Sequence, residues 1–262
     1  MARAVAHVFV DDLRQPRLRE QDLHHLARAL RLRPGEEVTL SDGQGGSLAG
    51  EWTGTGVAPL TGAGPSREPP PQPVLTVGFA LVKGDRPEWA VQKLTEAGVD
   101  RIVVMTSARC VARWSAEAAP RHMDKLREVA RQAAMQSRRT WLPSVQGPVG
   151  LADLVKGAEG AALAVPGGSP LTLATPTVLV GPEGGWESAE LLLATEQVGL
   201  GPCVLRAETA ALAAGVLLSA LRAGLVAPAP GKTAPGAGPQ PDDVSTGPGA
   251  PSPTRSCRST RT

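Results

Sequence analysis

Aromatic and cysteine side chains are scarce in this chain. It has no Tyr and 2 Phe among 262 residues, and aromatic residues make up 3% of it. Recognition of nucleic acid by stacking bases on a platform of aromatic rings is therefore not expected. The three cysteines, Cys110, Cys203 and Cys257, are odd in number and far apart, which argues against a disulfide framework and a zinc site. We expect a reducing compartment and no metal.

Long apolar runs and a strong charge imbalance are also missing. No apolar run approaches the roughly 18 residues of a membrane span, and the start, MARAVAHVFVDDL, lacks an apolar core followed by a cleavage site. We expect a cytoplasmic protein with no membrane contact. The formal net charge of +2 is too small for a protein that is basic over its whole surface, although the 27 Lys and Arg can still gather on one face.

Several catalytic and nucleotide-binding motifs do not occur. The chain contains no G-x-G-x-x-G, so a Rossmann dinucleotide site is disfavoured, and no G-x-x-x-x-G-K-[ST], so a P-loop does not hold phosphates. H-E-x-x-H and G-x-S-x-G are absent as well. The hydrolase and NTPase classes thereby lose their main support.

The sequence pattern in the first quarter of the chain predicts a small domain followed by a linker. Residues 5–57 consist of short alternating segments with one helical stretch, residues 21–32, which ends at Pro34 and Gly35. This pattern predicts a mainly β domain over residues 1–58. Residues 59–73, PLTGAGPSREPPPQP, cannot form a helix or an internal strand, because proline lacks the N–H donor and fixes φ. They are predicted to be a linker.

Residues 74–226 alternate apolar strands with helices, which is typical of an α/β domain with a mostly parallel sheet. Strands are expected to begin near residues 74, 101, 161, 177 and 202. Helices are expected over residues 87–97, 121–139, 187–197 and 209–222. Residues 227–262 are rich in Pro, Gly, Ser and Thr and almost lack large apolar side chains, so we expect a disordered tail.

Two strand ends in this domain carry the residues with the most chemical interest. Residues 180–186, VGPEGGW, join an apolar strand to a helix, and glycine at such a strand end lets backbone groups approach a ligand. The alternative is a tight turn with no ligand, in which Glu183 only fixes the loop. The second segment, residues 200–209, also precedes a helix; its Arg206 and Glu208 either face the same pocket or form a structural ion pair.

Basic residues concentrate in two helical stretches. The helix over residues 121–139 has six Lys and Arg against Asp124 and Glu128, and its apolar positions follow helical spacing, so the basic side chains should lie mostly on the exposed side. Residues 14–33 have six Arg against Glu20 and Asp22. A solvated surface explains either run alone. Basic runs in both parts of the chain together favour contact with RNA phosphates.

An ordered set of segments resembles one known family, the ribosomal RNA uridine-N3 methyltransferases of the small subunit (RsmE), a branch of the SPOUT class. Gln92-Lys93-Leu94-Thr95-Glu96-Ala97-Gly98-Val99 resembles the family's Q-K-x-T-E-L-G motif and follows Lys83. Arg109 stands where the family has an arginine after the next strand. Residues 133–139, AAMQSRR, resemble its A-x-x-Q-S-x-R motif, and the GPEGG turn and the segment LRAETA follow in the family's order. The likeness covers nearly all of residues 5–226.

The resemblance implies a PUA-like barrel followed by an α/β methyltransferase domain with a trefoil knot. It implies S-adenosylmethionine as the cofactor, held by Val165, Pro166, Gly181, Gly185, Leu200, Gly201, Pro202, Cys203 and Leu205. Glu183, Arg109 and Arg206 would be the catalytic residues, with Glu183 taking or relaying a proton. RNA contacts would come from Lys83, Lys93, Arg131, Gln136, Arg138 and Arg139. The family resemblance also implies a homodimer.

The implied reaction is methylation of N3 of a uridine in 16S ribosomal RNA of the small ribosomal subunit. Two alternatives stay open: another SPOUT enzyme that methylates a ribose 2′-oxygen or a different base, and a non-catalytic RNA-binding assembly factor. The chain departs from the family pattern at His7 and Ala108, where arginine and glutamate are common. Glu187 replaces a usual Ser/Thr cap, and Ala207 stands where Thr is frequent.

Overall fold

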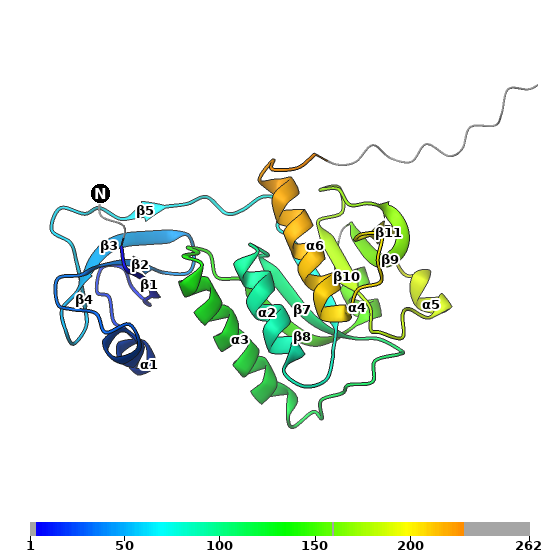
Figure 1. The fold of residues 1–262 in the computed structure, drawn as a ribbon, viewed down its shortest axis with the longest axis horizontal. Helices are drawn as coiled ribbons and strands as arrows, with labels where there is room; N and C mark the ends of the chain where they lie inside the picture. Colours follow the sequence, from blue (N-terminus) through cyan, green and yellow to red (C-terminus); the bar gives the residue numbers. More distant parts are fainter. Residues whose placement is uncertain (1–3, 159, 228–262) are drawn as a thin grey trace, which may run out of the picture. The chain divides into compact units, whose positions relative to one another are not determined.

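The structure, a computed structural model, describes residues 4–158 and 160–227, which form two β-sheets and the helices around them (Figure 1). The first sheet has the order β1-β2-β3-β4, with β5 also paired to β3. Its first two strands are parallel and the other pairs are antiparallel. The strands are β1 (Ala6–Phe9), β2 (Glu37–Ser41), β3 (Gly46–Trp52), β4 (Val57–Pro59) and β5 (Ser66–Arg67).

The predicted helix near residue 21 packs on this first sheet as two short pieces, α1 (Glu20–His24) and a π-helical turn, η1 (His25–Ala29). Leu26 of this turn is fully buried in one apolar cluster with Val8, Leu40 and Trp52. The alternation of buried and exposed residues in β3 is that of a strand with one face on a core. The prediction of a small, mainly β N-terminal part is therefore confirmed.

The second sheet is parallel throughout, with the strand order β11-β9-β10-β6-β7-β8. This confirms the predicted α/β class. In chain order the strands are β6 (Thr76–Ala80), β7 (Arg101–Thr106), β8 (Ser144–Gly150), β9 (Ala161–Pro170), β10 (Thr177–Val180) and β11 (Glu196–Gly199). The central strands are buried on both faces, which explains why they read as continuous apolar runs.

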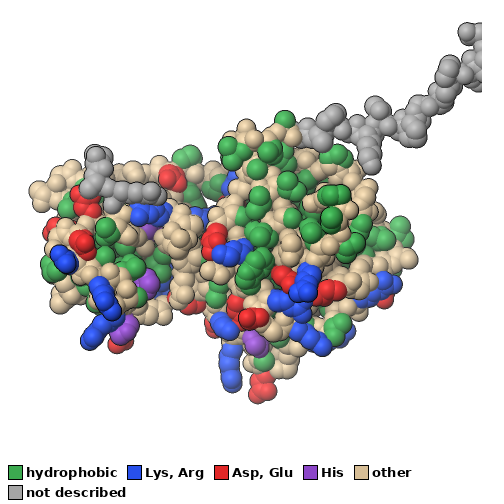
Figure 2. All heavy atoms as spheres, in the orientation of Figure 1, with side chains coloured by type: hydrophobic (Ala, Val, Ile, Leu, Met, Phe, Trp, Pro, Cys, Tyr) green, Lys and Arg blue, Asp and Glu red, His purple; other side chains and the backbone are tan. Residues whose placement is uncertain are grey.

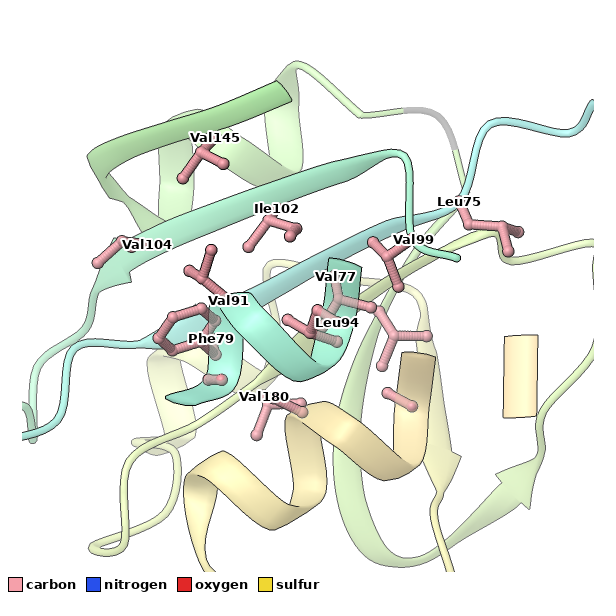
Figure 3. Packing of buried hydrophobic residues seen from close by; sticks show 14 of the residues in the cluster. Leu75, Val77, Phe79, Val91, Leu94, Val99, Ile102, Val104, Val145 and Val180 are labelled. Atoms are coloured by element: carbon pink, nitrogen blue, oxygen red, sulfur yellow. The ribbon is translucent and has the colours of Figure 1, made fainter. Parts of the chain in front are cut away.

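Three long helices lie side by side over one face of this sheet, with α2 in the middle (Figure 1). They are α2 (Arg86–Glu96), α3 (Ala119–Gln136) and α6 (Ala207–Arg222). Val91 and Leu94 of α2 pack toward Val77, Phe79 and Ile102 of the strands (Figure 3). The opposite face of the sheet packs against the short helix α4 (Leu151–Lys156), and α5 (Ser188–Leu191) follows the GPEGG turn.

The ends of α2 follow directly from the sequence. Pro87 stands in its first turn, where the missing N–H is not needed, and Gly98 just after its last turn has φ of 94°. The predicted apolar stripe of α3, with Met123, Leu126 and Ala130, is buried as expected. The helix expected over residues 209–222 begins two residues earlier, at Ala207.

Several sequence predictions for this domain were wrong. No strand begins at Pro202: the strand before it, β11, ends at Gly199, and residues 200–206 form a loop in which Val204 is 88% exposed. Gly201 with φ of 148° and Pro202 without an N–H prevent a regular ladder. The helix predicted over residues 187–197 shortens to α5, because its last residues enter β11.

Strand β8 and helix α4 were missed. The segment Ser144–Gly150 contains Gly147 and Pro148, which read as turn residues, yet it pairs with β7 at an edge where an irregular register tolerates them. Residues 59–73, predicted as a linker, contribute the last residue of β4 and all of β5. The domain boundaries remain predictions, and the predicted tail lies outside the described residues from position 228 on.

None of the helices in residues 4–158 and 160–227 combines the length and the apolar character needed to cross a membrane.

Candidate cofactor pocket and active site

A cavity of about 430 Å³ opens at the carboxyl end of β10, beside the part of β9 where its pairing with β10 stops, within the size range of small-molecule sites. Three segments line it: the middle of β9, the loop after β10, and the end of β11 with the loop that follows it. All of the cofactor-binding residues expected from the sequence line this cavity except Pro202. The full lining consists of Ala164, Val165, Pro166, Val180, Gly181, Pro182, Glu183, Gly185, Trp186, Leu191, Gln197, Leu200, Gly201, Cys203, Val204, Leu205, Ala207 and Ala210.

The indole of Trp186 forms one wall and fixes the shape of the pocket. Its Nε1 donates a hydrogen bond of 3.0 Å to the carbonyl oxygen of Ala164, the last residue of β9 that pairs with β10. A Cβ at Gly181 would lie 2.9 Å from Cε2 of this ring, so only glycine fits there without displacing the indole. Sequence reasoning did not single out Trp186, although it directly follows the GPEGG turn.

The GPEGG turn is closed by its own backbone and braced from the loop after β7. Gly185 donates from its N–H to the carbonyl of Pro182 at 2.8 Å and has φ of 71°. The Arg109 guanidinium donates to the carbonyl of Gly184 at 2.9 Å. Glu190 accepts from the backbone N–H groups of Glu187 at 2.9 Å and Ala108 at 2.8 Å, and it forms a capping box with Glu187 at the start of α5.

Glu183, the expected proton acceptor, lies at the rim of the pocket with half of its side chain exposed. Its Oε1 accepts a hydrogen bond of 2.7 Å from Nη1 of Arg86, the first residue of α2. The same Arg86 atom lies 3.7 Å from Oε2 of Glu208 in the first turn of α6. Sequence reasoning missed Arg86; its place just after β6, at the edge where the pocket forms, was the available signal.

Arg206 and Glu208 do not form the structural pair considered from the sequence. Arg206 occupies the N-cap position of α6, and its side chain is exposed. Within the described part of the chain this side chain makes no hydrogen bond or ion pair. Glu208 is buried, with 11% of its side chain exposed, and its charged neighbour is Arg86. The Arg206 side chain is therefore accessible from solvent, whereas Glu208 is held inside the protein.

Of the residues expected to contact RNA, four are at least partly accessible. Lys83 and Gln136 are exposed, and Gln136 lines a second cavity of about 410 Å³ between α2 and α3. Lys93 pairs with Glu96 at 2.7 Å, and Arg138 donates to the carbonyl of Ala4 at 2.6 Å. On the face shown in Figure 2, Lys and Arg side chains lie beside Asp and Glu side chains rather than in a continuous basic area.

The other two expected RNA contacts, Arg131 and Arg139, are used inside the protein. Arg131 of α3 forms a buried double hydrogen bond with Asp22 of α1, at 2.8 and 2.5 Å, although its helix was expected to expose its basic side chains. Arg139 donates to the carbonyls of Thr95 and Val99 and pairs with Asp100 at 3.2 Å. These partners favour a structural role for both guanidinium groups.

His7 is also buried, at the place where the family commonly has arginine. Its Nε2 donates a hydrogen bond of 3.0 Å to the carbonyl oxygen of Arg139. Burial lowers the pKa of His7 to about 4, against the opposing effect of this hydrogen bond. A neutral ring on an internal carbonyl cannot replace an arginine as a phosphate ligand.

Comparison with known proteins agrees with this fold and pocket. Residues 68–219 match the model of an RNA methyltransferase domain, and residues 18–51 match that of an RNA methyltransferase PUA domain. The class is therefore that of the RNA methyltransferases with an N-terminal PUA-like domain, as the resemblance implied.

The relatives identify the family within this class. The chain is 36% identical over 225 residues to "Ribosomal RNA small subunit methyltransferase E" of Mycobacterium bovis, covering 74% of this chain and 84% of the relative. It is 28% identical over 233 residues to the protein of the same name from Bacillus subtilis, covering 73% and 84%. The chain belongs to the ribosomal RNA small subunit methyltransferase E family.

Two solved structures resemble the chain over most of its length. A putative methyltransferase from Legionella pneumophila has a TM-score of 0.70 at 25% identity and covers 82% of this chain and 96% of its own. The ribosomal RNA small subunit methyltransferase E of Neisseria gonorrhoeae has a TM-score of 0.68 at 25% identity and covers 82% and 97%. Both of those proteins were solved with S-adenosylmethionine bound.

Proposed function

We propose that this protein transfers a methyl group from S-adenosylmethionine to N3 of a uridine in the 16S ribosomal RNA of the small ribosomal subunit. One observation carries the proposal: eight of the nine expected cofactor residues line the same cavity of about 430 Å³. The chain that forms this cavity belongs to the methyltransferase E family. The residues fit such a ligand, since the walls are largely apolar and Gly181 and Gly201 let the backbone approach it.

S-adenosylmethionine, when bound, supplies an electrophilic methyl group on a positively charged sulfur. The protein's part is to bring uridine N3 into line with that methyl group and to remove the proton from N3 as the new N–C bond forms. Glu183 stands at the rim of the cavity and accepts or relays this proton. The target base has to leave its stack to reach the cavity.

The proposed RNA contacts follow from accessibility. Arg206 is exposed beside the pocket, and Arg109 is half exposed while it braces the turn, so these two guanidinium groups are placed to hold phosphate or stabilise negative charge on the base. Lys83, Lys93 and Arg138 supply further contacts. A trefoil knot and a homodimer, both implied by the resemblance, are part of the same proposal.

The function is tested with small ribosomal subunits from cells that lack this protein. Labelled S-adenosylmethionine and purified enzyme are added, and the RNA is digested to nucleosides to locate the methyl group. N3-methyluridine is expected. A methyl group on a ribose 2′-oxygen or another base would instead identify a different specificity. No methyl incorporation, together with no calorimetric affinity for S-adenosylmethionine, would favour an assembly factor.

Glu183→Gln tests the role of the carboxylate in this reaction. The amide keeps the size of the side chain but cannot accept the proton, so the single-turnover rate should fall by about 10²- to 10⁴-fold. Calorimetry should show nearly unchanged affinity for S-adenosylmethionine. An unchanged single-turnover rate would remove Glu183 from the mechanism without affecting the identity of the product.

A further inference from the structure

Arg86 connects two of the segments that line the pocket. Its Nη1 donates to Glu183 of the GPEGG turn at 2.7 Å and lies 3.7 Å from Glu208 at the start of α6. Ala207, next to Glu208, and Glu183 itself both line the cavity. One side chain from α2 therefore lies between the carboxylate of a turn and that of the first turn of α6, two segments that come together only in the folded chain.

The Arg86 side chain is itself held in a fixed direction. Its Nε donates to the carbonyl oxygen of Lys83 in the loop after β6, at 3.1 Å. Two thirds of the side chain is buried, so its fork of N–H donors cannot sample many other positions. A guanidinium anchored in this way can restrict a partner that would otherwise be mobile, and Glu183 is half exposed.

The two carboxylates share this guanidinium unequally. Only the contact with Glu183 is a hydrogen bond; Oε2 of the buried Glu208 has no hydrogen-bond partner within the described residues. The shorter, hydrogen-bonded contact is the stronger one. Arg86 thus acts chiefly on Glu183, while Glu208 supplies a second, weaker electrostatic attraction from the interior side.

We propose that Arg86 is a positioning residue that holds the Glu183 carboxylate at the rim of the pocket in the orientation needed for methyl transfer. This rests on the proposed function, in which Glu183 handles the N3 proton.

A double-mutant cycle tests this assignment by total methyl incorporation in single turnovers at saturating S-adenosylmethionine and small subunits. Arg86→Gln should slow transfer about a hundredfold, the effect of a misplaced reacting group, and change the Kd for S-adenosylmethionine less than threefold. In the Glu183→Gln background, adding Arg86→Gln should reduce the rate of methyl transfer little further, because Arg86 acts through the Glu183 carboxylate. Arg86→Lys, which keeps the charge without the fork, should restore part of the rate.

The matched control is Arg101→Gln, which removes a partly exposed arginine bonded to Gln146 at the opposite end of the parallel sheet. Its rate should stay at that of the unmodified protein. The proposal would be overturned if the rate losses of Arg86→Gln and Glu183→Gln multiplied in the double variant. It would also be overturned if Glu208→Gln slowed transfer as much as Arg86→Gln does. Total incorporation is counted, so the cycle is informative even when the methyl group proves to be on another atom.

A crystal structure of the Arg86→Gln variant gives a readout that needs no activity. The Glu183 side chain should be displaced or disordered while Trp186 and the backbone of the GPEGG turn keep their positions. A Glu183 carboxylate that stays in place without Arg86 would overturn the proposal.

Discussion

The contact between Gly181 and Trp186 predicts a sharp effect of adding one methyl group. In Gly181→Ala the new Cβ would lie 2.9, 3.1 and 3.2 Å from three atoms of the indole. The backbone at Gly181 does not have a positive φ, so alanine is not strained by its own conformation. The whole effect therefore comes from the displaced ring.

The magnitude follows from what the indole can do in response. It must shift by a few tenths of an ångström, and its hydrogen bond to the Ala164 carbonyl at 3.0 Å resists the shift. Overpacking of this kind costs about 1–3 kcal/mol, and a strained hydrogen bond contributes about 1 kcal/mol to it. Since a factor of ten in affinity is about 1.4 kcal/mol, the Kd for S-adenosylmethionine should rise about tenfold to a hundredfold.

Calorimetry with S-adenosylmethionine and urea unfolding measure the two consequences. Gly64→Ala is the matched control, because a Cβ there meets nothing within 4 Å and φ is not positive. It should change stability by less than about 0.5 kcal/mol. In the Trp186→Phe background, Gly181→Ala should lower affinity and stability by less, since the smaller ring leaves room for the new methyl group. Unchanged affinity and unchanged stability in Gly181→Ala would refute the steric reasoning.

Two further predictions concern stability. Arg131→Met should lower the free energy of unfolding in urea by about 3–5 kcal/mol, because the carboxylate of Asp22 stays buried without a cation; the double variant with Asp22→Leu should recover much of this, and no recovery would contradict the reasoning. The pKa of His7 is lowered from 6.5 to about 4, chiefly by burial, so the folded state favours the neutral ring. The resulting stabilisation is complete above pH 6.5 and is lost as the pH falls toward 4. Over this range the free energy of unfolding should fall by roughly 3 kcal/mol. His7→Gln should lack this part of the acid sensitivity in urea unfolding, and identical pH profiles would argue against it.

Elements with a strong local signal were predicted well. Pro87 and Gly98 define both ends of α2, and the apolar spacing of Met123, Leu126 and Ala130 gives the buried face of α3. The strands in the centre of the sheet are apolar on both faces and were found as well. Edge elements failed, since β8 contains turn-forming residues and β11 begins with polar Glu196 and Gln197.

The pocket was predicted through an ordered set of motifs rather than through local structure. Residues 202–206 were wrongly taken for a strand, yet most of that segment lines the cavity, because the family pattern placed it there regardless of its secondary structure. Arg131 and Arg139 show the converse. The sequence of a basic helix does not indicate whether its guanidinium groups face solvent or an internal carboxylate.

The amino-acid sequence alone determined the α/β class, the PUA-like part before it and the family, because hydrophobic periodicity and motif order are properties of neighbouring residues along the chain. Only the tertiary structure decided which charged groups meet. Arg86 and Glu183 are 97 residues apart and Arg131 and Asp22 are 109 apart, and such pairs form where the packing of helices and strands brings them within hydrogen-bond distance. Local sequence rules carry no information about that distance.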